Sequence, residues 1–293
     1  MGDILRLLGP RTAGAAVYQG SVVVHTALAS FSAIVGEGAV AVLYFANRLV
    51  QLPLALVGTA AAQASLPSLA EQAAKDDLPA FRTTLLTVLR MVGFSVLPAS
   101  MGLIVLARPI VHGLFERGAF DASATLATSQ ALACYAVGLL AYAVSKVLTG
   151  AFYALHDTRT PVRLSIEAMV VNVALSVALM WPLKVNGLAL AAAVANSLNA
   201  VRLARCLEAR LGTPLLTALR GPLLRQLAAS LLMGAACWWV SRQGVAALPP
   251  WGELSLLILT GLVGYAVSCR FVGVRELSSV LRWFSHSRPF ASK

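Results

Sequence analysis

The chain has 293 residues, of which 58% are hydrophobic and only 12% are charged. Soluble globular domains usually carry about 25% charged residues, so this composition excludes an ordinary soluble enzyme and favours a bundle of membrane-spanning helices. The formal net charge of +11 would suit a nucleic-acid partner, but the basic residues interrupt apolar runs and form no single polar face, which excludes that interpretation.

Eight apolar stretches follow one another along the chain, separated by charged or Gly- and Pro-containing breaks. A spanning helix needs about 20 apolar residues to cross about 30 Å of hydrocarbon. We therefore predict an all-α integral membrane protein with about eight transmembrane helices. The predicted spans are 10–35, 38–60, 84–107, 124–150, 162–183, 186–206, 222–241 and 252–272. Residues 61–83 mix alanine and leucine with charge, which predicts an interfacial amphipathic helix between the second and third spans.

The basic residues predict the orientation of these spans. With the N-terminus in the cytoplasm, the outer connections hold only Arg108, Arg117, Lys184 and Arg242, and Arg48 lies within the membrane. The other 18 of the 23 basic residues then fall on the cytoplasmic side, as the positive-inside rule requires. Both termini are expected to be cytoplasmic. No cleaved signal peptide is expected, because the first apolar run is too long and lacks a cleavage site.

Arg48 is the most unusual residue of the second span, because no other charge occurs between Glu37 and Glu71. An arginine at mid-bilayer costs about 2.5–3.5 kcal/mol on insertion scales, so such a residue usually faces a water-filled cavity or a partner. Asn47 and Gln51 share its sector of the helix, and guanidinium is shaped to bind phosphate bidentately. We predict a cavity wall formed by these three residues; the alternative is pairing with a structural carboxylate or a helix C-terminus.

Three weaker polar candidates lie in other spans. His25 is in the middle of the first span, and Asn172 and Ser176 share a face of the fifth. Together they are candidates for an ion or polar site. The alternative is that they form hydrogen bonds that only serve helix packing.

The sixth span carries small residues at a spacing of four, which places them on one helix face. They are Gly187, Ala191, Ala195 and Asn199. Small residues at this spacing let helices approach closely in lipid, so we expect this face to be a packing surface.

Enzymatic motifs are absent from the sequence. It contains no GxSxG nucleophile elbow, HExxH zinc motif or P-loop, and its four cysteines have no metal-ligand spacing. We predict no catalytic residue, no metal site and no cofactor. Transport would then be driven by an ion gradient or by the membrane potential.

Three stretches resemble the second half of the MurJ/MviN family, the lipid II flippases of the MOP superfamily. They are YFANRLVQLPLALVGTAAAQASLPSLA (from residue 44), LFERGAF (114–120) and FYALHDTRTPV (152–162), and the resemblance extends over 7–272. Family members have fourteen helices, arranged as two six-helix lobes around a central cavity and a final pair. The resemblance implies a second lobe at 1–210, two additional transmembrane helices at 211–272 and a basic cytoplasmic tail at 273–293.

The resemblance also implies a function and a substrate. The family moves lipid II, an undecaprenyl-diphosphate-linked peptidoglycan precursor, from the cytoplasmic to the periplasmic leaflet of the bacterial inner membrane by alternating access. Arg48 occupies the position of a cavity arginine of the family, so its guanidinium is expected to meet the diphosphate. The last two helices are expected to form a groove for the lipid tail.

The chain departs from the family pattern at several site positions. Asn47 and Gln51 stand where relatives carry acids, and His25 and Ser176 stand where some relatives place acids that bind sodium. A sodium site is therefore not expected, and coupling to protons or to the membrane potential is the alternative.

The first lobe of the family is missing from these residues. We expect the chain to be a fragment of a longer protein; a separately encoded partner lobe, self-association or loss of activity are the alternatives. Three other functions remain open: export of another polyprenyl-linked oligosaccharide, drug/cation antiport, or a non-transporting membrane scaffold left by truncation.

Overall fold

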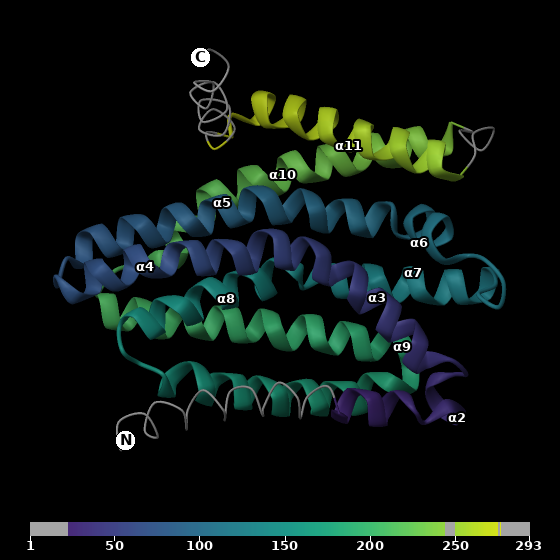
Figure 1. The fold of residues 1–293 in the computed structure, drawn as a ribbon, viewed down its shortest axis with the longest axis horizontal. Helices are drawn as coiled ribbons and strands as arrows, with labels where there is room; N and C mark the ends of the chain where they lie inside the picture. Colours follow the sequence, from purple (N-terminus) through teal and green to yellow (C-terminus); the bar gives the residue numbers. More distant parts are fainter. Residues whose placement is uncertain (1–22, 244–249, 275, 277–293) are drawn as a thin grey trace, which may run out of the picture.

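The computed structural model describes residues 23–243, 250–274 and 276, and every regular element in these ranges is helical. Most of the helices run along the long axis of the molecule (Figure 1). Their bounds are α2 Ser32–Val35, α3 Ala39–Pro53, η1 Leu54–Thr59, α4 Ala60–Ala74, α5 Leu78–Val105, α6 Ala107–Phe115, α7 Ala122–Val137, α8 Leu139–Ala154, α9 Arg159–Leu211, α10 Leu215–Arg242 and α11 Pro250–Val272. Among the described residues, five helices are long and apolar enough to cross a membrane, and the bent pair α7–α8 makes a sixth. The prediction of an all-α membrane protein is confirmed.

Helix α9 is a hairpin of two antiparallel arms, residues 159–183 and 185–211 (Figure 1). Lys184 at its tip adopts φ 51° and ψ −133°, which lies outside the helical region and reverses the chain. Contacts along the hairpin pair Gly187 with Leu179, Arg202 with Glu167, and Arg210 with Asp157. The two arms account for the predicted fifth and sixth spans, and residues 23–29 are the described end of the first. The described part of the chain is therefore consistent with about eight spans.

Helices α3, η1 and α4 form one continuous helix over Ala39–Ala74. The π-helical turn η1 directly follows Pro53, whose ring removes a backbone donor and disturbs the regular hydrogen-bond ladder. The predicted separate interfacial helix at 61–83 was wrong. Residues 61–74 continue the second span, because buried Ser65 and Leu69 pack this segment against α5 and α8. Residues 78–83 are the first turns of α5.

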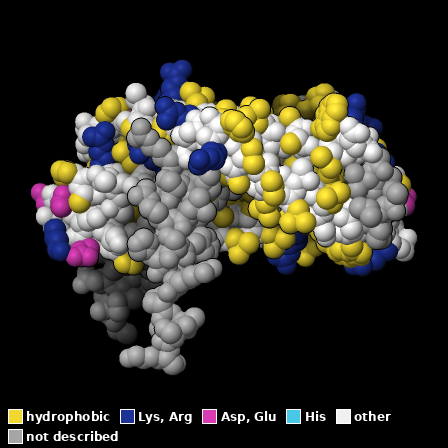
Figure 2. Space-filling model, turned by 90° about the horizontal axis from the view of Figure 1, so that it is seen from above, with side chains coloured by type: hydrophobic (Ala, Val, Ile, Leu, Met, Phe, Trp, Pro, Cys, Tyr) yellow, Lys and Arg dark blue, Asp and Glu magenta, His cyan; other side chains and the backbone are white. Residues whose placement is uncertain are grey.

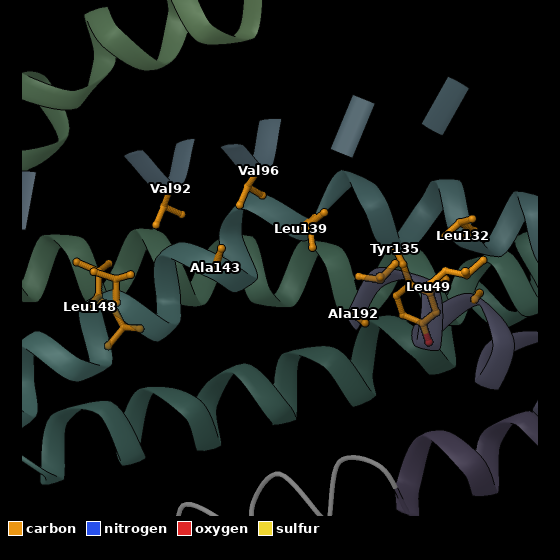
Figure 3. Close-up of a cluster of buried hydrophobic side chains, with 14 of the residues drawn as sticks. Leu49, Val92, Val96, Leu132, Tyr135, Leu139, Ala143, Leu148 and Ala192 are labelled. Carbon is orange, nitrogen blue, oxygen red and sulfur yellow. The ribbon is translucent and has the colours of Figure 1, made fainter. Parts of the chain in front are cut away.

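The hydrophobic core lies where α3, α5, α7, α8 and the second arm of α9 meet. Figure 3 shows part of it, with the labelled side chains Leu49, Val92, Val96, Leu132, Tyr135, Leu139, Ala143, Leu148 and Ala192. The predicted small-residue face of the second arm is buried, and at Gly187 it lies against Leu179 of the first arm. Gly138, between α7 and α8, lies so close to that arm that an added Cβ would be 2.6 Å from the Cα of Ala193. Close backbone approach is thus what holds the arm in place.

Helices α10 and α11 pack outside this bundle, with α10 against α5 and α11 against α10 and α6. Their outward side chains are large and apolar: Trp239 is 63% exposed, Leu262 66% and Phe271 86%. Figure 2 views this side of the molecule and shows a hydrophobic belt between two groups of Lys and Arg side chains. Such a belt is what lipid contact requires.

Candidate functional site

Arg48 lies on the side of α3 that points away from the core. Ala46, Leu49 and Val50 are buried, whereas Arg48 is exposed together with Tyr44 and Leu52, one turn before and one turn after it. The interior face of α3 is therefore already occupied by the bundle. The guanidinium therefore lies on the exposed surface of α3.

The contacts of Arg48 are local and involve no acid. Its guanidinium carbon lies 5.7 Å from the centre of the Tyr44 ring, a cation–π distance. None of the five ion pairs formed by the described residues includes Arg48. Within this part of the chain, the alternative of neutralisation by a structural carboxylate finds no support. No hydrogen bond within the described residues uses the guanidinium as a donor.

Asn47 and Gln51 bind each other one turn apart. The Gln51 Nε2 donates to the Asn47 Oδ1 at 2.9 Å, so the two amides form a small polar ledge beside Arg48. Sequence reasoning grouped these three residues but missed Tyr44, although its spacing of four from Arg48 places the two on one helix face.

His25, Asn172 and Ser176 form a second polar group on the first span and the first arm of α9. The Asn172 Nδ2 lies 2.8 Å from the His25 Nε2, and the Ser176 Oγ lies 3.5 Å from the Asn172 Oδ1. Asn172 and Ser176 are buried and His25 is half-buried. The structure thus brings the three residues together, although His25 and Asn172 are 147 positions apart in the sequence. No described group of three His, Cys, Asp or Glu side chains has the arrangement of a metal site.

The LFERGAF motif, at the end of α6 and in the turn before α7, packs against α3. The Phe45 ring of α3 lies 4.9 Å from the Phe115 ring and 5.6 Å from the Phe120 ring, measured between centroids. Gly118 takes a positive φ of 61° in the intervening turn, a conformation in which glycine is favoured. Phe45 precedes Arg48 by three residues, so this aromatic cluster helps to fix the helix that carries the guanidinium.

The FYALHDTRTPV motif closes the base of the α9 hairpin. The Asp157 Oδ1 accepts from the Arg159 and Thr160 amides, and its Oδ2 accepts from the Arg210 Nη1 at 2.8 Å. Burial alone would raise the pKa of the Asp157 carboxyl, but the hydrogen bonds and the Arg210 charge outweigh it, and the pKa lies below its ordinary value. The motif is therefore a helix cap and an inter-arm tie.

A pocket of about 400 Å³ opens at the opposite end of the hairpin. Its lining comes from the end of α2, the start of α3 and the turn between them, from α7 and from the hairpin tip: Val35, Gly36, Glu37, Ala39, Val42, Ala127, Gln130, Pro182, Leu183, Lys184, Val185 and Asn186. None of the predicted site residues belongs to this lining. This pocket therefore does not test the predicted cavity wall at Arg48, which stays a prediction.

Comparison with known proteins identifies what this arrangement is similar to. The family model described as "Lipid II flippase MurJ" matches residues 1–259. The probable lipid II flippase MurJ of Rhizobium tropici is 33% identical over 98% of this chain and 54% of its own length. The corresponding Vibrio cholerae protein is 35% identical over 90% of this chain and 50% of its own length.

A solved structure shows the same fold. It is described as lipid II flippase MurJ in an inward closed conformation, and it superposes with a TM-score of 0.78 at 24% identity. The match covers 94% of this chain and 55% of that one. The chain thus spans about half the length of the curated relatives it matches.

Proposed function

The chain belongs to the MurJ family of lipid II flippases, and on this premise we propose that it supplies the second lobe (1–210) and the final helix pair (211–272) of such a transporter. The transporter carries undecaprenyl-diphosphate-linked peptidoglycan precursor from the cytoplasmic to the periplasmic leaflet of the bacterial inner membrane. One observation carries the proposal: an arginine without an ion-pair partner among the described residues lies on the exposed side of α3.

In this proposal the exposed side of α3 faces the first lobe, and the space between the lobes is the transport cavity. The Arg48 guanidinium binds the diphosphate through paired charge-assisted hydrogen bonds. The Tyr44 ring restricts the guanidinium's orientation, and the Asn47–Gln51 ledge offers further polar contacts. Rocking of the lobes then exposes the bound headgroup alternately to the two sides of the membrane.

The other partners follow from the same arrangement. The apolar outer faces of α10 and α11 contact membrane lipids, and the polyprenyl tail lies along this pair of helices. In the proposed orientation the Asp157 end of the hairpin, with its basic residues, faces the cytoplasm, as the positive-inside rule favours, and both termini are proposed to be cytoplasmic. The protein acts as a transporter and performs no covalent chemistry.

A chimera tests the function. This chain should replace the second half of the Rhizobium tropici relative and restore outer-leaflet lipid II in cells depleted of their own flippase, whereas this chain alone should not, because one cavity wall is missing. The measurement is the amount of lipid II accessible to an externally added, lipid II-cleaving enzyme. If the chimera is stable in the membrane and exports an O-antigen lipid but leaves lipid II inside, the substrate assignment is wrong.

We assign ion coupling to His25, Asn172 and Ser176. When neutral His25 carries its proton on Nδ1, the Asn172 amide donates to the Nε2 and its oxygen faces the Ser176 hydroxyl. A proton on Nε2 turns this acceptor into a donor, so the amide has to reverse and donate toward Ser176. The group lacks the carboxylate oxygens that a hard cation such as sodium prefers. A proton can therefore reset the hydrogen bonds between the first span and α9.

Replacement of His25 by glutamine in the chimera should make lipid II transport independent of pH between about pH 5 and pH 8, the range in which an ordinary histidine changes charge. The unmodified chimera should respond to pH and not to sodium. Initial rates in proteoliposomes, with sodium replaced by potassium, measure both effects. An unaltered pH profile in His25→Gln, or a sodium requirement in the unmodified chimera, would remove His25 from the coupling mechanism.

A further inference from the structure

A second pocket, of about 300 Å³, lies between α5, α10 and the end of α11. Its lining consists of Arg90, Pro222, Arg225, Gly273, Val274 and Glu276. Two arginines from different helices thus face one small space, together with a single acid. The pocket shares no lining residue with the α3 face or with the His25 group.

The sequence places this pocket at the boundary of the hydrocarbon layer. Residues 91–107 of α5 and α6, 226–241 of α10 and 254–269 of α11 contain no charged residue. At 1.5 Å per residue, each of these windows spans roughly 25 Å, close to the thickness of the bilayer core. Arg90, Arg225 and Arg270 directly flank the windows at one end. The pocket therefore lies at the depth of the phospholipid phosphates.

The two arginines are held in place by close packing of α5 against α10. Gln226 is fully buried, and its Nε2 donates to the backbone oxygen of Arg90 at 3.1 Å. An added Cβ on Gly93 would lie 2.5 Å from the Gln226 Oε1 and 2.6 Å from Leu223, so the helices touch at this point. Gln226 directly follows Arg225 in the sequence and is hydrogen-bonded to the backbone of Arg90. The distance between the backbones of the two arginines is therefore fixed by the packing of α5 against α10.

The hydrogen-bonding capacity of the pair is not used inside the described structure. The Arg90 Nε is buried and has no hydrogen-bond partner there, and neither arginine takes part in the ion pairs of the described residues, although Glu276 lines the pocket. A buried donor without an acceptor is unfavourable. An anion with several acceptor oxygens would satisfy it.

We propose that the pocket between Arg90 and Arg225 binds the phosphate group of an anionic phospholipid. A guanidinium pair suits a phosphate because each fork donates two parallel hydrogen bonds, and basic pockets between transmembrane helices at this depth bind lipid headgroups. The acyl chains have an apolar surface beside the pocket, since Leu224 is 55% exposed and Phe271 86%. A bilayer lipid is therefore favoured over a free anion.

Binding of phosphatidylglycerol to this chain in nanodiscs tests the proposal without lipid II, so its outcome does not depend on the flippase assignment. The unmodified chain should retain phosphatidylglycerol over phosphatidylcholine, as measured by native mass spectrometry of lipids kept after transfer to detergent. The variant Arg90→Gln/Arg225→Gln should lose at least about tenfold in affinity, because it removes charge-assisted bonds. Arg220→Gln is the matched control, because Arg220 is exposed near the same end of α10 and does not line the pocket.

A gain-of-binding variant guards against a loss caused by misfolding. Glu276→Gln removes the acid from the pocket and should tighten phosphatidylglycerol binding by a few-fold, while thermal unfolding reports that all variants fold. Equal losses in Arg220→Gln and in the double variant would overturn the proposal, as would unchanged binding in Glu276→Gln. Displacement of phosphatidylglycerol by millimolar inorganic phosphate would also overturn it, because the pocket would then be a site for soluble anions.

Discussion

Replacement of Arg48 by alanine in the chimeric flippase is expected to abolish lipid II transport. Two charge-assisted hydrogen bonds are worth about 3 kcal/mol or more together, which corresponds to a loss of at least about a hundredfold in diphosphate binding. Folding should be unaffected, because Arg48 is exposed and the core side of α3 is formed by other residues. The measurement is outer-leaflet lipid II together with the amount of protein in the membrane.

The conservative variant and a matched control sharpen this prediction. Arg48→Lys should keep little activity, because an ammonium group is a point charge and lacks the planar bidentate fork of the guanidinium. Arg242→Ala is the control: Arg242 also lies over an aromatic ring, 4.2 Å from the centre of Trp238, but at the far end of α10. It should transport normally. Normal transport by Arg48→Ala, or an equal loss in Arg242→Ala, would contradict the cavity role.

Hydropathy predicted most of the fold because each span has to satisfy its backbone hydrogen bonds within one apolar helix. The same reasoning misplaced 61–83, where charge density suggested a helix on the membrane surface. Tertiary packing decides that segment: Leu69 is fully buried, so the second span extends beyond the hydrocarbon as a continuous helix. Pro67 lies within this helix without ending it. No local signal in the sequence indicates such packing.

The candidate sites divide in the same way. The grouping of Asn47, Arg48 and Gln51 follows from helix periodicity, and the structure adds only their partners. The contact of His25 with Asn172 depends on how the first span packs against α9, which periodicity does not encode. The Arg90–Arg225 pocket also needs the fold, because its arginines come from helices that are far apart in sequence.

The π-helical turn η1 lies just beyond Arg48 in the same continuous helix. It begins at Leu54, directly after Pro53. Gly58 within this turn touches α8, where an added Cβ would lie 2.9 Å from the Ala143 Cβ. The turn η1 and helix α4 thus pack against α8, while the exposed side of α3 carries Arg48 ahead of η1.

The second large effect is expected at Gly138, where a methyl group should destabilise the whole bundle. Gly138 separates α7 from α8, which are bent by 43° against each other. A Cβ there would meet the Ala193 Cα at 2.6 Å and its Cβ at 2.8 Å, and a backbone atom cannot rotate away. Overpacking usually costs about 1–3 kcal/mol, and we expect Gly138→Ala to reach the upper end of this range.

Gly102→Ala supplies the same substitution without the collision. Gly102 lies inside α5 with nothing within 4 Å of an added Cβ, so alanine there should stabilise the helix by about 0.5–1 kcal/mol. The temperature of half-unfolding in detergent should fall for Gly138→Ala and rise for Gly102→Ala. The folded fraction at each temperature is measured by size-exclusion chromatography. Ala193→Gly should rescue Gly138→Ala only in part, because it removes the clashing methyl group of Ala193 and leaves the clash with its backbone. Equal stability of Gly138→Ala and Gly102→Ala would mean that the second arm of α9 can shift away from the α7–α8 bend, and that this close approach does not fix the core.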